Sequence, residues 1–204
     1  AEAFLGLHEV NEALERLAKV YPKLVEEVVP KKVGLSQLSE LLRRLVDESV
    51  CIRDLMTVLE CLAEHASYET DNVGLTELVR SALRNQLAYQ HTGGSDRLNA
   101  VTLDPMVEDT IRGSITRTAQ ASYLSLDPEI RQLIFANLHR VVRNALAAGV
   151  RPILLCQPDV RRFVRVMLSD DLPDLAVLSY QELPGHLVIH PLGRVTLEGE
   201  LAAA

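Results

Sequence analysis

The histidine pair in the segment HLVIH is the first candidate for metal chemistry, because His186 and His190 stand four residues apart. On a helix this spacing would bring both imidazoles to one face, where they could share a metal ion. The residues between them are Leu, Val and Ile, which favour a strand. At roughly 3.3 Å per residue the two rings would lie about 13 Å apart, beyond the reach of one ion. We therefore predict no metal site at this pair.

Other arrangements that carry catalysis or bind cofactors are also missing from the sequence. It contains no Walker loop, no GxGxxG, no GxSxG and no HExxH. The three cysteines, Cys51, Cys61 and Cys156, show no CxxC spacing, as expected for packed thiols in a reducing compartment. His65 and His139 fall within predicted helices, where a role at the helix edge is commoner than that of a general base. We predict a protein that is not an enzyme and that uses no cofactor and no metal ion.

Composition and charge narrow the class of protein further. The chain has 204 residues, of which 48% are hydrophobic and 24% charged, as in ordinary intracellular globular proteins. Its 21 basic and 28 acidic residues give a net charge of −7, which argues against a surface built to bind phosphates. We interpret the local exceptions as solvated faces; these are Arg43, Arg44, Arg161, Arg162 and Arg165. No apolar run approaches the roughly 18 residues that a membrane span needs, and no signal-peptide pattern begins the sequence.

The first part of the chain has the periodicity of helices. Residues 8–29 are predicted to be helical with an interruption at Tyr21 and Pro22, because proline disfavours helical geometry in the residue before it. Three amphipathic helices are then predicted, at about 36–48, 54–66 and 73–90. Ser36 is the expected N-cap of the first. Asp54 would place a carboxylate at the positive end of the second.

The pattern changes after the segment His91–Ser95 (HTGGS), which has the composition of a linker. Asp104 and Asp127 each precede a proline and predict helix starts, with stops near Gly113 and Gly149. Residues 114–125 have mixed periodicity and receive no assignment. Strands are predicted at 99–103, 153–156, 175–180, 187–189 and 195–197, with a further helix at 158–168. The predicted fold class is mixed α and β, helix-rich overall, with an all-helical subdomain followed by a small α/β subdomain.

Several segments together resemble one protein family. They are the element PKLVEEVVP (Pro22–Pro30), a leucine-rich helix, a link that ends in Ile52, Arg53 and Asp54, and a helix that ends in LAEHA (Leu62–Ala66). This combination resembles the C-terminal cytoplasmic region of the type III secretion export-gate family, also called the FHIPEP family, which includes flagellar FlhA and its injectisome counterparts. The likeness continues through Leu75–Gln90 and LPDLAVLSYQEL (Leu172–Leu183), and so covers nearly the whole chain.

The resemblance implies a domain organisation. Family members carry a membrane-embedded N-terminal half and a FHIPEP signature, neither of which occurs in this sequence, so we expect a C-terminal fragment. Residues 1–30 would complete an upstream subdomain, and residues 31–94 would form a three-helix subdomain. Residues 95–197 would form the α/β subdomain and residues 198–204 a flexible tail.

The resemblance also implies a function. The chain would belong to a ring, understood to be nonameric, at the cytoplasmic face of the bacterial inner membrane, where it would receive chaperone–substrate complexes and regulators for export. It leaves open whether the system is flagellar or serves virulence. Charged residues flanking the predicted helices are the candidates for contacts between protomers. These candidates are Arg53, Asp54, Glu60, Glu64, Arg80 and Arg84.

Two other classes of function stay open at this point. Three helices followed by a strand could form a winged-helix-like nucleic-acid-binding regulator, with Leu75–Gln90 as its recognition helix. That helix, however, offers only Arg80 and Arg84 as basic residues. Alternatively the α/β part could hold an active site at the ends of its strands, at Gln157, Ser179 and Gln181, for which fold-level analogy is the only argument.

Overall fold

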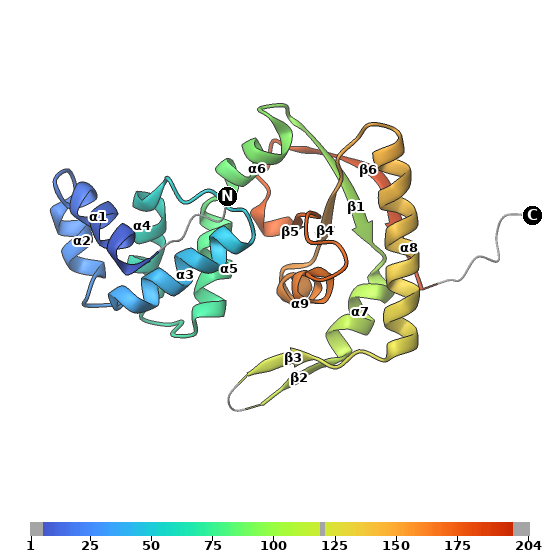
Figure 1. The fold of residues 1–204 in the computed structure, drawn as a ribbon, viewed down its shortest axis with the longest axis horizontal. Helices are drawn as coiled ribbons and strands as arrows, with labels where there is room; N and C mark the ends of the chain where they lie inside the picture. Colours follow the sequence, from blue (N-terminus) through green and yellow to red (C-terminus); the bar gives the residue numbers. More distant parts are fainter. Residues whose placement is uncertain (1–5, 119–120, 198–204) are drawn as a thin grey trace, which may run out of the picture. The chain divides into compact units, whose positions relative to one another are not determined.

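The computed structural model describes residues 6–118 and 121–197, and it confirms the mixed α and β fold class (Figure 1). The chain forms two compact units, Ala1–Leu87 and Ala88–Ala204, which we call the helical unit and the α/β unit. The boundary falls inside a helix, Arg84–Thr92, and not at the predicted linker. The subdomain roles implied for residues 1–30, 31–94 and 95–197 stay predictions. Residues 198–204, the predicted flexible tail, lie outside the described residues.

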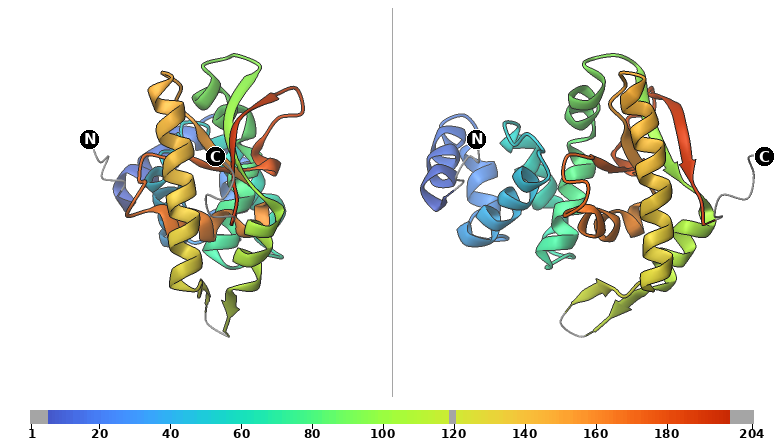
Figure 2. Two further views of the ribbon diagram at one scale, coloured as in Figure 1. Left: turned by 90° about the vertical axis from the view of Figure 1, so that its right-hand side faces the viewer. Right: turned by 45° about the vertical axis from the view of Figure 1, so that its right-hand side comes forward.

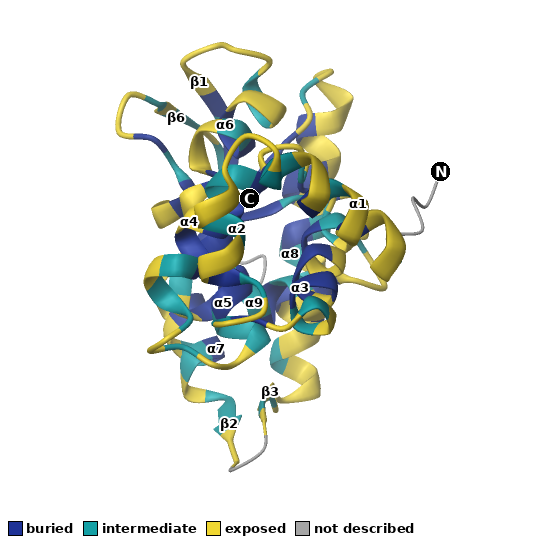
Figure 3. Ribbon diagram, turned by 90° about the vertical axis from the view of Figure 1, so that its left-hand side faces the viewer, coloured by how far each residue is buried: buried dark blue, intermediate teal, exposed yellow. Residues whose placement is uncertain are grey.

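The helical unit is built from short amphipathic helices that share one core. Its helices are α1 (Leu7–Ala18), α2 (Pro22–Val28), α3 (Leu35–Asp47), α4 (Leu55–His65), α5 (Asn72–Ala82) and the start of α6 (Arg84–Thr92). In α3 the leucines recur at helical spacing, so Leu38, Leu41 and Leu45 lie on one face and are fully buried. Figure 3 shows the same segregation, with buried inner faces and exposed outer faces on these helices.

Most of the predictions for the helical unit are confirmed. The helices predicted at 36–48 and 54–66 are α3 and α4, and the chain breaks at Tyr21 before Pro22 opens α2. Ser36 is not an N-cap, because α3 already begins at Leu35 with Gly34 as its cap residue. The single helix predicted at 73–90 is wrong, since a turn at Leu83 separates α5 from α6.

Two side-chain hydrogen bonds within α5 accompany the break at Leu83. The Ser81 hydroxyl donates to the carbonyl of Glu77 at 3.1 Å, and the Thr76 hydroxyl donates to the carbonyl of Asn72 at 2.7 Å. Such bonds to the i−4 carbonyl weaken and bend helices. Leu83 and Leu87 are both buried, so the chain changes direction while keeping its apolar residues in the core.

The α/β unit contains a four-stranded parallel sheet with the strand order β5-β4-β1-β6 (Figure 2). Its strands are β1 (Arg97–Leu103), β4 (Ile153–Cys156), β5 (Val177–Ser179) and β6 (Val188–Val195), and β2 (Ile115–Arg117) and β3 (Ser122–Leu124) form a separate antiparallel pair. Its helices are α7 (Pro105–Gly113), α8 (Pro128–Ala147), α9 (Pro158–Leu168) and the 3-10 turn η1 (Tyr180–Glu182).

One hydrophobic cluster joins the strands to α7, α8 and α9. Side chains of β1, β4 and β5 meet apolar side chains of the helices, among them Ile111, Ile134, Leu138 and Val164. The predicted helix starts are confirmed, because the carboxylate of Asp104 accepts from the N–H of Met106 at 3.0 Å and that of Asp127 from the N–H of Glu129 at 2.8 Å. Among the described residues, no helix is both long and apolar enough to cross a bilayer.

The structure assigns one segment of the α/β unit that had no predicted element, and it departs from the predictions at two places. Residues 114–125 contain the β2–β3 hairpin, and the two strands predicted at 187–189 and 195–197 are one strand, β6, which pairs with all of β1. Arg161 does not lie on a solvated face, as it is only 1% exposed and its Nη1 donates to the carbonyl of Val177 at 3.3 Å. The guanidinium donors of Arg161 and Arg165 instead satisfy carbonyls at and before β5.

Candidate assembly and docking surface

Helix α4 and the link before it position four of the six charged residues predicted to contact other protomers. Asp54 caps the helix, because its Oδ1 accepts from the N–H of Thr57 at 3.1 Å and its Oδ2 from the Thr57 hydroxyl at 2.7 Å. Its neighbour Arg53 is exposed. Glu60 and Glu64 are also exposed and stand one turn apart on α4. The fold therefore presents these four side chains at the surface of the helical unit, although Asp54 also serves its own helix.

A first groove, which we call the α1 groove, lies where α1 meets the 52–56 link and has a volume of about 500 Å³. Its walls are mostly apolar, with Arg53 and Asp54 among the charged residues that line it. Val20 and Tyr21 beside it are 67% and 46% exposed, so apolar surface at this groove meets water. The apolar residues of the groove are Val10, Ala13, Leu17, Val20, Tyr21, Leu42, Ile52, Leu55 and Met56. Such a groove can accept apolar side chains of a protein partner while its charged residues set their direction.

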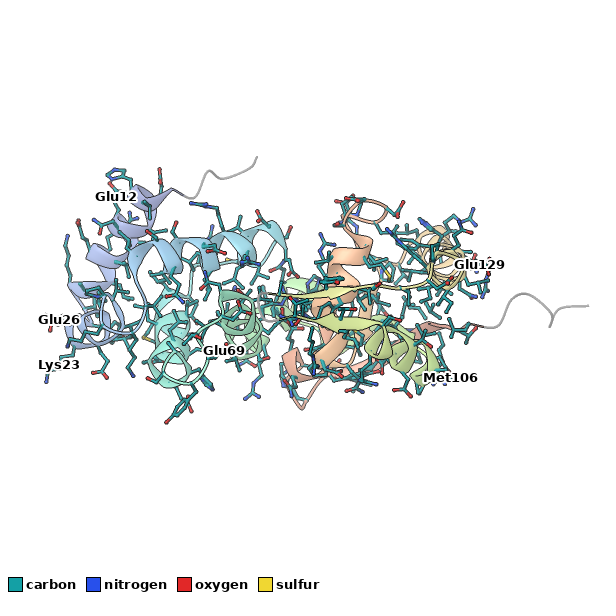
Figure 4. All side chains as sticks on the ribbon, turned by 90° about the horizontal axis from the view of Figure 1, so that it is seen from below. Glu12, Lys23, Glu26, Glu69, Met106 and Glu129 are labelled. Atoms are coloured by element: carbon teal, nitrogen blue, oxygen red, sulfur yellow. The ribbon has the colours of Figure 1, made fainter. Side chains whose placement is uncertain are left out.

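A second groove, the α2–α4 groove, has a volume of about 480 Å³ and is lined mostly by charged residues. Glu60 and Glu64 line it from α4, opposite Lys23 and Glu27 of α2. Lys32 also lines this groove, where its Nζ donates to the carbonyl of Ala63 and lies 3.6 Å from Oε1 of Glu27. Figure 4 shows Lys23 and Glu26 projecting outward from α2. Mixed charges of this kind favour orientation of a partner more than tight binding.

The remaining two candidates, Arg80 and Arg84, have different surroundings. Arg80 is 2% exposed, and its Nη1 lies 3.0 Å from Oε2 of Glu48 at the C-terminus of α3. Its guanidinium thus holds α5 to α3 and is not presented to a partner by the folded chain. Arg84 is exposed at the start of α6. The role of the other five residues in protomer contacts stays a prediction.

Three of the residues weighed for catalysis or metal binding take part in internal hydrogen bonds, two of them through the backbone. The N–H of Gln157 donates to Oε1 of the buried Glu108 at 2.9 Å, and the N–H of Ser179 donates to Glu182 in a capping box. Nδ1 of His190 lies 3.1 Å from Oδ1 of Asn99. Within residues 6–118 and 121–197, no three metal-ligating side chains gather to hold an ion.

The pKa shifts of several side chains also fit structural roles for them. Burial raises the pKa of the Cys61 thiol to about 11, which keeps it protonated and unreactive at neutral pH. Burial also raises the pKa of Glu108 and that of Tyr180. By contrast, the Arg112 guanidinium lowers the pKa of Asp159, to which it donates two hydrogen bonds. Our sequence analysis missed both Glu108 and the Arg112–Asp159 pair, because their partners come from separate helices.

Comparisons with known proteins agree on one family. The model of the FHIPEP family matches residues 1–187. The chain is 35% identical over 197 residues to "Low calcium response locus protein D" of Yersinia pestis and 34% identical over 197 residues to the flagellar biosynthesis protein FlhA of Bacillus subtilis. Both alignments cover 97% of this chain but 28% and 29% of those proteins, so the chain spans less than a third of their length.

Solved structures give the same result. The complex of Chlamydia pneumoniae CdsV with CdsO contains a chain of similar fold, with a TM-score of 0.88 and 41% identity, over 95% of this chain and 56% of that one. The nonameric SctV-C of EPEC matches with a TM-score of 0.85 and 33% identity, over 94% of this chain and 57% of that one. Both structures are cytoplasmic domains of type III secretion export-gate proteins.

Proposed function

The chain belongs to the FHIPEP family, the export-gate family of type III secretion, and on this premise we propose that it forms part of a cytoplasmic ring that receives chaperone–substrate complexes for export. The observation that carries the proposal is the match to nonameric structures, since the fold of SctV-C is shared over 94% of this chain. The nonameric cytosolic domain of EscV matches similarly, with a TM-score of 0.80. A ring of this kind needs protomer contacts and free surface for cargo.

The helical unit supplies features suited to both needs. Arg53 and Asp54 stand at the charged edge of the apolar α1 groove, and Glu60 and Glu64 line the α2–α4 groove. Charged edges around apolar contact area are the usual anatomy of a protein–protein interface. We assign the protomer contacts to this surface. The platform would act by binding, and the carboxylates of Glu108 and Glu182 and the ring of His190 serve internal hydrogen bonds.

The proposal extends to location and partners. The ring would lie at the cytoplasmic face of the bacterial inner membrane, and the contact with the membrane would be made by the part of the relatives that this chain does not match. CdsV is found in a complex with CdsO. We infer that a protein of the same kind, together with regulators and export chaperones, binds the ring that contains this chain.

The test is the mass of the protein in solution, measured by light scattering after size exclusion at several concentrations. It uses this chain and one extended upstream to the start of the matching cytoplasmic domain. We expect concentration-dependent oligomers from the extended chain, and we expect Arg53→Glu to weaken association severalfold, because reversal of an edge charge creates repulsion. Arg97→Glu, an exposed arginine of the α/β unit, is the matched control.

Asp54 requires a separate design, because it caps α4. Asp54→Asn keeps an oxygen that can accept from Thr57, whereas Asp54→Ala loses the cap at a cost of about 1 kcal/mol of stability. An association defect in the Asn variant therefore reports on the charge. Strict monomers from the extended chain, or equal effects of Arg53→Glu and Arg97→Glu, would refute the assignment.

A further inference from the structure

Helix α8 carries a run of basic residues that the assembly surface does not use. Between Glu129 and Asp159 the only charged residues are Arg131, Arg140, Arg143 and Arg151, in a chain whose net charge is −7. All four arginines are exposed. This excess of positive charge belongs to one helix and the segment after it. Arg131 lies about 180° around the helix from Arg140, so within α8 only Arg140 and Arg143 share one exposed side.

The arginines of α8 form few strong contacts within the chain. Nη2 of Arg140 donates to Oδ1 of Asn137 at 2.7 Å, and Nε of Arg143 makes a long contact of 3.4 Å to the carbonyl of His139. The guanidinium of Arg131 stacks on Phe135, 5.2 Å from the ring centre. In the part of the chain that the structure describes, none of these arginines pairs with a carboxylate, unlike Arg44 with Glu40 or Arg112 with Asp159.

Two of the arginines belong to an exposed strip along α8. The strip consists of Leu133, Ala136, Arg140, Arg143 and Ala147, all of which are exposed. We call it the α8 strip. Its spacing of three, four, three and four residues places these side chains along one side of the helix. At 1.5 Å per residue the strip is about 21 Å long.

The α8 strip lies opposite the buried face of the helix. The buried residues are Ile134, Leu138, Val141, Val142 and Ala145, which pack in the core of the α/β unit. At 100° per residue their mean direction is about 165° from that of the strip. In Figure 2 α8 is a single straight helix in front of the sheet. A second helix could therefore lie along the strip without disturbing the core.

The composition of the α8 strip indicates which partner it fits. Ala136 and Ala147 have small side chains, which allow the backbone of another helix to approach closely. Leu133 is 42% exposed and offers an apolar contact. Arg140 and Arg143 can each bind a carboxylate through two parallel hydrogen bonds. The complementary surface is a helix with acidic residues opposite the arginines and an apolar residue opposite Leu133.

Anionic membranes and nucleic acids fit the strip less well. A helix that lies on a membrane inserts its apolar face, but the apolar face of α8 is buried against the sheet. A phosphate backbone would find Leu133 and two alanines between few cations, whereas nucleic-acid sites cluster many basic residues on a basic domain. A protein helix that bears carboxylates and an apolar residue could contact every residue of the strip.

We propose that the α8 strip is a docking site for an acidic amphipathic helix of a partner protein. The inference deepens the proposed function, because it rests on the role of a docking platform and names the chemistry of one partner. Its test measures binding by the chain itself and does not require a ring. Loss of ring formation would refute the proposed function without changing this result.

The test uses a fluorescent helical peptide of about 20 residues, with Glu placed opposite Arg140 and Arg143 and Leu opposite Leu133. A second peptide carries Lys in place of Glu. Binding is measured by fluorescence anisotropy for the chain, for Arg140→Glu/Arg143→Glu, and for the control Arg97→Glu/Arg117→Glu. The control reverses two exposed arginines of the same unit and changes the net charge equally. Circular dichroism checks that both variants are folded.

We expect the acidic peptide to bind the unmodified chain and to bind the α8 variant about tenfold more weakly or worse, because two attractive charge pairs become repulsive. The control variant should change affinity by less than about twofold, since its charges lie outside the site. The Lys peptide should not bind. Equal losses in both variants, or no binding of the acidic peptide, would overturn the proposal. Binding of duplex DNA or phosphatidylglycerol vesicles that depends on Arg140 and Arg143, without binding of the peptide, would overturn it too.

Discussion

Replacement of Arg80 tests whether this residue holds the helical unit together. Its side chain is 2% exposed and that of Glu48 is 20% exposed, with 3.0 Å between Nη1 and Oε2. Removal of one partner of a buried ion pair leaves the other charge without compensation, at a cost of about 3–5 kcal/mol. Because Glu48 retains some contact with water, we expect Arg80→Met to lower the free energy of unfolding by about 2–4 kcal/mol.

A double-mutant cycle isolates the contribution of the pair. Glu48→Gln removes the carboxylate charge and keeps the shape of the side chain. If the two charges depend on each other, the variant Arg80→Met/Glu48→Gln should lose about 1–2 kcal/mol less than the sum of the single losses. Arg80 has other contacts besides Glu48, so the single substitution alone does not measure the pair.

The assay is urea unfolding followed by far-ultraviolet circular dichroism, with hydrogen exchange of α3 and α5 amides to identify the transition of the helical unit. Arg44→Met is the matched control, because Arg44 is exposed and pairs with Glu40 on its own helix. That control should cost less than about 0.5 kcal/mol. An equally small loss for Arg80→Met, or additive losses in the cycle, would refute the reasoning.

Two further predictions concern the α/β unit. Burial raises the pKa of Glu108, so its ionised form destabilises the folded state once the pH exceeds the unfolded pKa near 4.5. Glu108→Gln can still accept from the N–H of Gln157, so it should raise the melting temperature at pH 7, by a difference that shrinks as the pH falls below 4.5. A difference in melting temperature that does not depend on pH would contradict this cause. At Gly193, an added Cβ would lie 2.5 Å from Cγ1 of Val141. Gly193→Ala should therefore lower the free energy of unfolding, measured in urea, by about 1–3 kcal/mol. The control Gly185→Ala should be nearly neutral, because a Cβ there meets no atom within 4 Å.

Local signals in the sequence predicted most of the helix boundaries. Asp54, Asp104 and Asp127 cap the helices that follow them, because a cap depends on residues two or three positions away. Features that depend on distant partners were not predictable. The continuity of β6 arises from its pairing with β1 about ninety residues earlier. The β2–β3 hairpin likewise has no strong pattern of its own.

The candidate surface was predictable in part for the same reason. Exposure of Glu60 and Glu64 follows from their place on the polar side of α4, and Arg53 is exposed in the link before it. Burial of Arg80 does not follow from its own helix, since its partner Glu48 lies 32 residues earlier. The α8 strip has no apolar pattern of its own, because the apolar stripe of α8 lies on the buried face, so its exposure is evident only from the fold.

The distinction between buried and exposed charges determines how assembly mutants of this chain must be read. Charge reversal at Arg80 places a carboxylate beside Glu48 in the core of the helical unit, so unfolding would abolish ring contacts even if Arg80 touches no neighbour. Arg53 is exposed and lines the α1 groove, so its reversal changes mainly the charge that a partner meets. An assembly defect in Arg53→Glu with unchanged stability would thus locate a protomer contact at the α1 groove. The same defect in Arg80→Glu would show only that the helical unit must be folded.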